Sequence, residues 1–292
     1  MQAALDQLRQ QVAGVGYIAD PSLLTSLWLM TELQRPLLLE GDAGVGKTEV
    51  AKTLAEVLHQ PLIRLQCYEG LDVSTAVYEW NYQRQLLAIR RQEAEHEKHI
   101  SEQALFSDTY LLKRPLLQAI SEDKPAVLLI DEIDRADEEF EAYLLEVLSD
   151  FQVSIPELGT IKANSIPLVI LTSNGTRELS DALRRRCLYH YIDYPDYDKE
   201  LRIVLARLPD VGANLAAQIV EFVQSLREQD LRKIPGVAET LDWASALLKL
   251  DIKSLGDNPE AVLATLGCLL KTREDIGALP PETIHRLVAK AS

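Results

Sequence analysis

The sequence predicts an α/β fold in which a parallel five-stranded sheet is covered by helices on both faces and followed by a helical domain. Three observations predict it: short, continuously apolar runs, helical patterns between these runs, and helical patterns alone after Pro195. Continuous apolar runs are typical of strands buried on both faces, as in a parallel sheet. Alternation of strands and helices indicates an α/β layer arrangement. We therefore expect two domains, residues 1–195 and residues 196–292.

Each element follows from one of these patterns. The expected strands are Leu37–Glu40, Leu62–Gln66, Ala126–Asp131, Leu168–Thr172 and Tyr189–Tyr194. The expected helices of the first domain are Thr48–His59, Tyr110–Ser121 and Asp137–Ser149. The expected helices of the second domain are Glu200–Leu208, Ala213–Arg227, Glu239–Leu250, Pro259–Leu270 and Pro281–Ala291.

Charge and apolar content narrow the classes of partner. The chain has 292 residues, of which 47% are hydrophobic, and a net charge of -15. Such a charge argues against the phosphate backbone of a nucleic acid or an anionic membrane as the main partner. The segment Met1–Asp6 lacks a signal-peptide pattern, and no apolar run approaches the ~20 residues of a membrane helix. We expect a cytoplasmic protein without a membrane span.

The cysteines and histidines do not suggest a metal site. Cys67, Cys187 and Cys268 are far apart and odd in number, so we expect reduced structural thiols. His96 and His99 lie one residue closer together than the histidines of a metal-binding H-E-x-x-H helix. A solvated, charged helix face is the better interpretation of that pair.

The strongest chemical signal is a glycine-rich loop that fits G-x-x-x-x-G-K-[ST] between a predicted strand and a predicted helix. Its glycines allow successive backbone N–H groups to surround a phosphate, and the helix presents its positive end to the same anion. We expect ATP here, with Lys47 on the β- and γ-phosphates and the Thr48 hydroxyl on Mg²⁺. The alternative is a glycine-rich turn that matches by chance. The expected nucleotide-binding residues are Asp42, Ala43, Gly44, Val45, Gly46, Lys47, Thr48 and Glu49.

The second signal is the apolar run before Asp131 and Glu132. A strand that ends in two acids places both carboxylates at the carboxyl edge of the sheet, where open α/β sheets bind ligands. We expect Asp131 to hold Mg²⁺ through water and Glu132 to polarise the attacking water. The alternative for Glu132 is an acid favoured by the start of a helix.

Together with further motifs, these residues resemble the AAA+ ATPases, and within them the MoxR family. The motifs are the glycine-rich loop, the runs 128–136, 172–174 and 180–186, and the segments 64–72 and 145–151. The last two segments resemble the MoxR-type ATPases encoded with carbon monoxide dehydrogenase maturation genes. The family's usual Asp-Glu-Ile-Asn-Arg-Ala has Asp134 in place of Asn here. The resemblance implies an AAA+ αβα core, residues 1–195, and a helical lid, residues 196–292.

The resemblance also implies roles for single residues. Asn174 matches sensor 1, which helps to position the lytic water, with a plain strand-end turn as the alternative. Arg186, and after it Arg185, matches the arginine finger that stabilises charge on the γ-phosphoryl group of a neighbouring subunit. The alternative for the run 184–186 is a solvated basic helix end. Tyr17 and Ile18 lie where the family contacts adenine, although Tyr17 could equally be part of the core.

Three further segments are interpreted through the resemblance. Residues 152–161 alternate around a Pro-Glu-Leu-Gly turn and predict the β-hairpin of this clade. Residues 78–106 occupy the place of its helix-2 insertion, or form a structural loop. Thr240 stands where the family usually has the sensor-2 arginine, so Arg232 or Lys233 could substitute.

The implied activity is hydrolysis of ATP with Mg²⁺ by a ring, expected to be a hexamer. By resemblance, the work is remodelling of a client protein, a metalloenzyme that needs cofactor insertion, with a von Willebrand factor A domain protein as partner. Two other classes share the motifs. One is a nucleic-acid motor or loader, and the other is a regulatory switch that binds ATP but barely hydrolyses it.

Overall fold

The computed structural model describes residues 2–95 and 102–292, which form two compact units. The sheet unit comprises Ser22–Glu40 and Thr48–Tyr191. The helical unit comprises the N-terminal segment up to Pro21, the loop Gly41–Lys47 and the chain from Ile192 to the C-terminus. The pair His96 and His99, which we interpreted as part of a charged helix face, lies outside the described residues.

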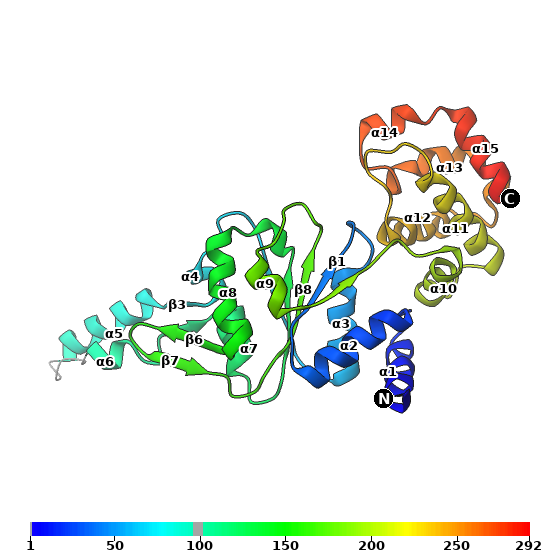
Figure 1. The fold of residues 1–292 in the computed structure, drawn as a ribbon. Coiled ribbons are helices and arrows are strands. Elements are labelled where there is room, and N and C mark those ends of the chain that lie inside the picture. Colours follow the sequence, from blue (N-terminus) through cyan, green and yellow to red (C-terminus); the bar gives the residue numbers. More distant parts are fainter. Residues whose placement is uncertain (1, 96–101) are drawn as a thin grey trace. The chain divides into compact units, whose positions relative to one another are not determined.

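The sheet unit is built on five parallel strands in the order β2-β5-β8-β1-β9 (Figure 1). Their bounds are β1 Leu37–Glu40, β2 Leu62–Gln66, β5 Val127–Asp131, β8 Leu168–Ser173 and β9 Leu188–Tyr191. The predicted α/β fold with a parallel five-stranded sheet is therefore confirmed. All residues of β5 are buried, as the continuous apolar run predicts for a central strand.

The register of the strands gathers polar side chains at one edge. Gln66 pairs with Asp131, and Glu40 pairs with Ser173 and Tyr191. Each of these residues ends its strand, so the carboxyl ends of the parallel strands meet at a common edge. The loops that follow these strands carry the predicted chemistry.

Helices surround the sheet, and their starts follow from the sequence. Asp137 caps α8, because its carboxylate accepts a hydrogen bond from the amide of Phe140 at 2.8 Å. Ser180 caps α9 in the same way through the amide of Leu183, at 3.3 Å. The helices are α2 Pro21–Leu33, α3 Lys47–Leu58, α4 Val73–Ala76, α7 Pro115–Ser121, α8 Glu138–Asp150 and α9 Asp181–Arg186, with the 3-10 turn η1 Ile133–Arg135.

Two antiparallel pairs extend this unit. The predicted hairpin is present as β6, Gln152–Ile155, and β7, Gly159–Lys162. A second pair, β3 Tyr78–Trp80 and β4 Leu111–Lys113, brackets α5, Tyr82–Glu95, and α6, Glu102–Leu105 (Figure 1). The predicted helix Tyr110–Ser121 is wrong at its start. β4 pairs with β3 instead, and the helix begins at Pro115, which is favoured at the first helical position.

The helical unit contains α1, Gln2–Gly14, and the helices that follow β9. These are α10 Tyr197–Arg207, α11 Ala213–Arg227, α12 Val237–Lys249, α13 Pro259–Thr265, α14 Arg273–Ala278 and α15 Pro281–Ala291. The predicted helix Pro259–Leu270 is too long, since α13 ends at Thr265 and the 3-10 turn η3, Leu266–Cys268, follows. The helices that the sequence patterns did not predict include α1, α2, α4, α5, α6 and α14.

A buried ion pair lies within the helical unit. The Arg227 guanidinium donates to both carboxylate oxygens of Glu200, at 2.6 and 2.7 Å, and the Thr240 hydroxyl donates to the same carboxylate at 2.8 Å. The Glu200 side chain is fully buried, and that of Arg227 is 8% exposed. Such a pair persists only because every charged atom finds a partner.

Among the helices of residues 2–95 and 102–292, none has the length and apolar character needed to cross a bilayer. The three cysteines are free thiols, of which Cys67 and Cys187 are buried and Cys268 is half-buried.

Candidate active site

The glycine-rich loop joins the carboxyl end of β1 to the start of α3. A Cβ atom at Gly41 would lie 2.2 Å from the carbonyl oxygen of Ile192, so no side chain fits at this position. Gly44 has a φ of +84° and packs against Gly236, the N-cap of α12. The backbone amide of the next residue, Val237, donates to the Gly44 carbonyl at 3.0 Å. Gly41 and Gly44 are therefore required by the close approach of neighbouring backbone, and Gly44 also by its positive φ.

Lys47 is almost fully buried in this loop. Its ammonium donates to the carbonyl oxygens of Gly41 and Asp42, at 2.6 and 2.7 Å. Both contacts hold the ammonium inside the loop, where a phosphate would meet a positive charge. The loop therefore fits a phosphate group through its glycine cradle and its buried cation.

Asp131 lies at the end of β5, and its side chain is 5% exposed. The Thr48 hydroxyl donates to its carboxylate at 3.1 Å, and the Thr172 hydroxyl of β8 donates to the same oxygen, Oδ1. The guanidinium of Arg64 on β2 donates to the other oxygen, Oδ2. The hydroxyl and carboxylate of Thr48 and Asp131 form the hard-oxygen donor set that Mg²⁺ prefers.

Glu132 has a left-handed backbone with φ of 55°, which is uncommon for a residue other than glycine. Its amide donates to the Thr172 hydroxyl at 2.9 Å. Its carboxylate accepts from Gln66 Nε2 and pairs with Arg135 Nε, each at 3.2 Å. The sheet edge thus fixes both the main chain and the side chain of Glu132, and strain of this kind clusters at functional sites.

The other predicted site residues lie in both units. Asn174 directly follows β8, which lies between β5 and β1, so it belongs to the same sheet edge as Asp131. Arg185 and Arg186 end α9; Arg185 is exposed, and Arg186 donates to the Ala182 carbonyl at 3.0 Å and to the Ser149 hydroxyl.

The predicted adenine contacts belong to the helical unit. Tyr17 and Ile18 follow α1, within the unit that also holds Gly41–Lys47, and the Tyr17 amide donates to the Val12 carbonyl at 3.2 Å. At the position of the expected sensor-2 arginine, the Thr240 hydroxyl is buried and donates to Glu200. The backbone amides of Arg232 and Lys233 donate to Asp275, and the side chains of both residues are exposed.

Sequence reasoning missed Arg64, Gln66 and Thr172. The available signal was the alternation in β2, where Arg64 and Gln66 are exposed and the residues between and before them are buried. β2 pairs with β5, which ends in Asp131. Both polar side chains of β2 therefore reach the acids at the carboxyl end of β5.

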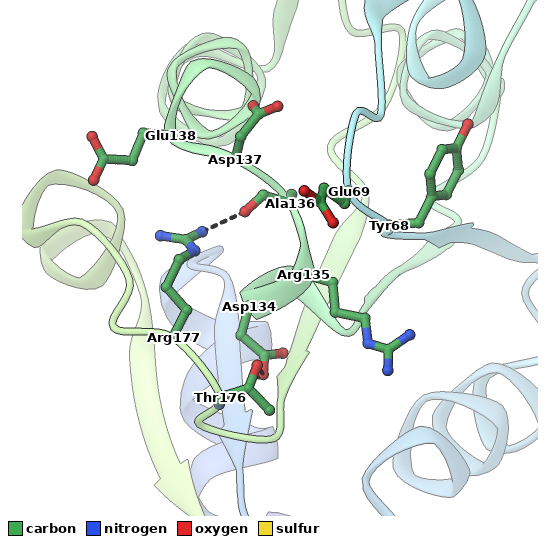
Figure 2. Close-up of a pocket in the computed structure, with 9 residues that line it drawn as sticks. All are labelled: Tyr68, Glu69, Asp134, Arg135, Ala136, Asp137, Glu138, Thr176 and Arg177. Atoms are coloured by element: carbon green, nitrogen blue, oxygen red, sulfur yellow. Dashed lines mark hydrogen bonds between the residues drawn. The ribbon is translucent and has the colours of Figure 1, made fainter.

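A pocket of about 550 Å³ lies beyond Glu132 in the sheet unit (Figure 2). Its lining residues are Tyr68, Glu69, Asp134, Arg135, Ala136, Asp137, Glu138, Thr176 and Arg177. The Arg177 guanidinium donates to the Ala136 carbonyl at 2.7 Å (Figure 2) and to Glu141. Burial acts to raise the pKa of Asp134. Hydrogen bonds from the Thr176 hydroxyl and amide, with those from the backbone of Asn174 and Asp134, together outweigh it, so the pKa lies below its usual value. Asp134, which stands in place of the family's usual Asn, is therefore a buried, ionised carboxylate.

The fold and the edge of the sheet define an AAA+ protein of the ATPase type. The chain belongs to the AAA domain (dynein-related subfamily) family, whose model matches residues 36–187, just over half of the chain. This match covers the sheet from just before β1 to just before β9 and includes the glycine-rich loop and both acids.

Several known proteins are similar to the chain. An uncharacterized protein of Staphylococcus aureus (strain USA300) is 29% identical over 241 residues, which are 80% of this chain and 82% of the relative. An uncharacterized protein of Staphylococcus epidermidis (strain ATCC 35984) is 28% identical over 216 residues, 72% and 74% of the two chains. Among solved structures, a mutant of Thermotoga maritima RuvB has a TM-score of 0.48 at 18% identity, covering 96% of this chain and 72% of that one.

Proposed function

We propose that this protein binds ATP with Mg²⁺ and hydrolyses it to ADP and phosphate. The observation that carries the proposal is the 3.1 Å contact between the Thr48 hydroxyl and the Asp131 carboxylate, with Glu132 as the next residue. Thr48 directly follows the glycine-rich loop, so the phosphate cradle is joined by one peptide bond to the donor set that fits Mg²⁺.

In this proposal the loop from Asp42 to Glu49 binds the phosphates, with Lys47 as their main point charge. Thr48 and Asp131 would hold Mg²⁺, which when bound neutralises charge on the phosphate oxygens. Glu132 accepts a proton from the attacking water, and Asn174 orients that water. Tyr17 and Ile18 contact adenine.

We further propose that Arg186 acts on the nucleotide of a neighbouring subunit, with Arg185 as the second candidate. An arginine finger that acts in trans requires a ring, and we propose a hexamer. Residues 1–195 would form the core of each subunit and residues 196–292 its lid. This part of the proposal rests on the family resemblance of the run 180–186.

The resemblance also guides the proposal for a client. The hairpin β6–β7 and the segment between β3 and β4 would face the client, a metalloenzyme that needs cofactor insertion, with a von Willebrand factor A domain protein as partner. A Glu132→Gln protein would hold ATP without turning it over, and a pull-down with this variant in ATP should retain both partners. Their absence from the captured material would contradict this choice of client.

The test of the activity is ATP turnover of the wild type and of Glu132→Gln. One observation favours a slow regulatory switch as a second candidate, since Gln66 and Arg135 both engage the Glu132 carboxylate. Negligible turnover by an assembled ring would support the switch. A nucleic-acid motor would instead increase its turnover with DNA or RNA, which we do not expect at a net charge of -15.

A further inference from the structure

A chain of hydrogen bonds connects the two acids of the site through β2. The Arg64 guanidinium donates from Nε to Asp131 Oδ2 at 3.1 Å, and from Nη2 to the same oxygen. The same Nη2 donates to Gln66 Oε1 at 2.6 Å. The Gln66 amide in turn donates from Nε2 to Glu132 Oε2 at 3.2 Å. The side chain of Asp131 is thereby linked to that of Glu132 through only two residues.

The partners of Asp131 favour different oxygens. Oδ1 accepts from the hydroxyls of Thr48 and Thr172. Oδ2 accepts from the guanidinium and, at 3.4 Å, also from the Thr48 hydroxyl. The Arg64 guanidinium forms an ion pair with this carboxylate, whose side chain is 5% exposed. A cation that approaches Asp131 therefore meets a positive charge already in place.

The guanidinium is placed so that it can leave. The Arg64 side chain is 50% exposed, and it reaches Asp131 from an exposed position of β2. An ion pair with one half-exposed partner is weak, because water competes for the exposed charge. A divalent cation carries twice the charge of a guanidinium and prefers oxygen ligands, so it competes well for the same carboxylate.

We propose that Arg64 is a positioning residue that a divalent cation displaces from Asp131. Without metal, Arg64 holds Asp131 and, through Gln66, the carboxylate of Glu132. When metal binds, the guanidinium leaves Asp131, and the link that holds Glu132 to Asp131 is broken. This inference rests on the proposed function of Asp131 as a residue of the Mg²⁺ site. It makes the tie between Glu132 and Asp131 depend on the metal, while the pair of Glu132 with Arg135 remains.

The experiment measures binding of fluorescent ADP over a range of Mg²⁺ concentrations for the wild type and Arg64→Gln. Removal of the competing charge should lower the half-saturating Mg²⁺ concentration by about three- to tenfold. The melting temperature of Arg64→Gln should fall below that of the wild type by more without metal than with Mg²⁺ and ADP.

Two further variants sharpen the test. Arg114 pairs with Glu79 in the same unit, and its side chain is 41% exposed, so Arg114→Gln removes an equal charge away from Asp131. It should leave the Mg²⁺ dependence unchanged. Arg64→Lys keeps the charge and should stay within about twofold of the wild-type half-saturating concentration. Arg64→Lys also provides the comparison if Arg64→Gln does not fold. A tenfold change of its half-saturating Mg²⁺ concentration would contradict the displacement of a charge, because the lysine keeps that charge.

The outcomes separate this inference from the proposed function. A wild type that binds no ADP at any Mg²⁺ concentration overturns the nucleotide site itself. If the wild type binds ADP with Mg²⁺ and Arg64→Gln has the same Mg²⁺ dependence, only the displacement is overturned.

Discussion

The ammonium of Lys47 lies 2.6 Å from the carbonyl oxygen of Gly41, the first residue of the glycine-rich loop. The lysine is therefore held inside the loop that it is expected to serve. We expect Lys47→Ala to weaken ATP binding by roughly 10- to 150-fold or more, because a lost charge-assisted contact costs roughly 1.5–3 kcal/mol and the loop also loses the support of the ammonium. Lys52→Ala, which changes an exposed lysine of the same helix paired with Glu49, is the control. Unchanged affinity of Lys47→Ala for labelled ATP would refute the phosphate site.

Glu132→Gln should bind ATP normally and hydrolyse it about 10²–10⁴-fold more slowly, because an amide cannot accept the proton of the water. The measurement is single-turnover hydrolysis at saturating ATP. Glu138→Gln, a change at an exposed acid of the first turn of α8, should leave the rate within twofold or so of wild type. Turnover of Glu132→Gln within tenfold or so of wild type, with ATP still bound, would assign the base to another residue.

Arg186→Ala tests the ring. The variant should bind ATP and assemble, and its hydrolysis should fall by about 10³-fold or more if Arg186 is the finger. Mixing Arg186→Ala with Glu132→Gln should restore part of the activity, because an Arg186→Ala subunit can receive an intact finger from its neighbour. No recovery in rings shown by mass to be mixed would contradict a role in trans. The same experiment with Arg185→Ala decides between the two arginines.

The contribution of the buried pair Glu200–Arg227 is measurable by unfolding. Arg227→Ala should lower the free energy of unfolding by about 3–5 kcal/mol, because the Glu200 carboxylate would stay buried without its charged partner. Arg232→Ala is the control, since Arg232 is 73% exposed and its contact with Glu274 is 3.9 Å long. That variant should remain within about 0.5 kcal/mol of wild type. Equal stability of the two variants in urea titrations would show that the buried pair adds nothing.

Thiol reactivity should follow burial and pH. Burial, with smaller effects from Asp131, Asp134 and Glu132, raises the pKa of Cys67 from an ordinary 9.0 to about 12. At pH 8 its thiolate fraction is about one in ten thousand, so iodoacetamide should modify half-buried Cys268 first, as mass spectrometry of peptides would show. The raised pKa contributes stability that is complete below pH 9 and declines as the pH rises toward 12. Modification of Cys67 as fast as Cys268 in the folded protein would contradict this burial.

The sheet could be predicted because its strands are buried on both faces. Residues 127–131 are apolar up to the final acid, and the structure places them at the centre of the sheet. The helix start at Pro115 could not be separated from β4, because the pairing of Leu111–Lys113 with Tyr78–Trp80 is a contact between distant parts of the chain. Local sequence patterns do not identify a pairing partner that is distant along the chain.

The acids and the glycine-rich loop could be predicted from the sequence because each is a contiguous motif. Arg64 and Gln66 could not, because their importance arises from the register that sets Gln66 beside Asp131. Thr240 shows a different limit. The resemblance predicts an arginine at its position, and the structure instead directs the Thr240 hydroxyl to the buried carboxylate of Glu200.

The close approach of Gly44 to Gly236 ties the glycine-rich loop to the first turn of α12, inside the helical unit. The hydrogen bond from Val237 to the Gly44 carbonyl closes that contact. Segments that pack into one compact unit tend to open together when a protein unfolds locally. The amides of Gly41–Lys47 should therefore exchange their hydrogens with solvent at the pace of the C-terminal helices, and a local melting of α12 would dismantle the phosphate cradle while the five-stranded sheet stayed folded.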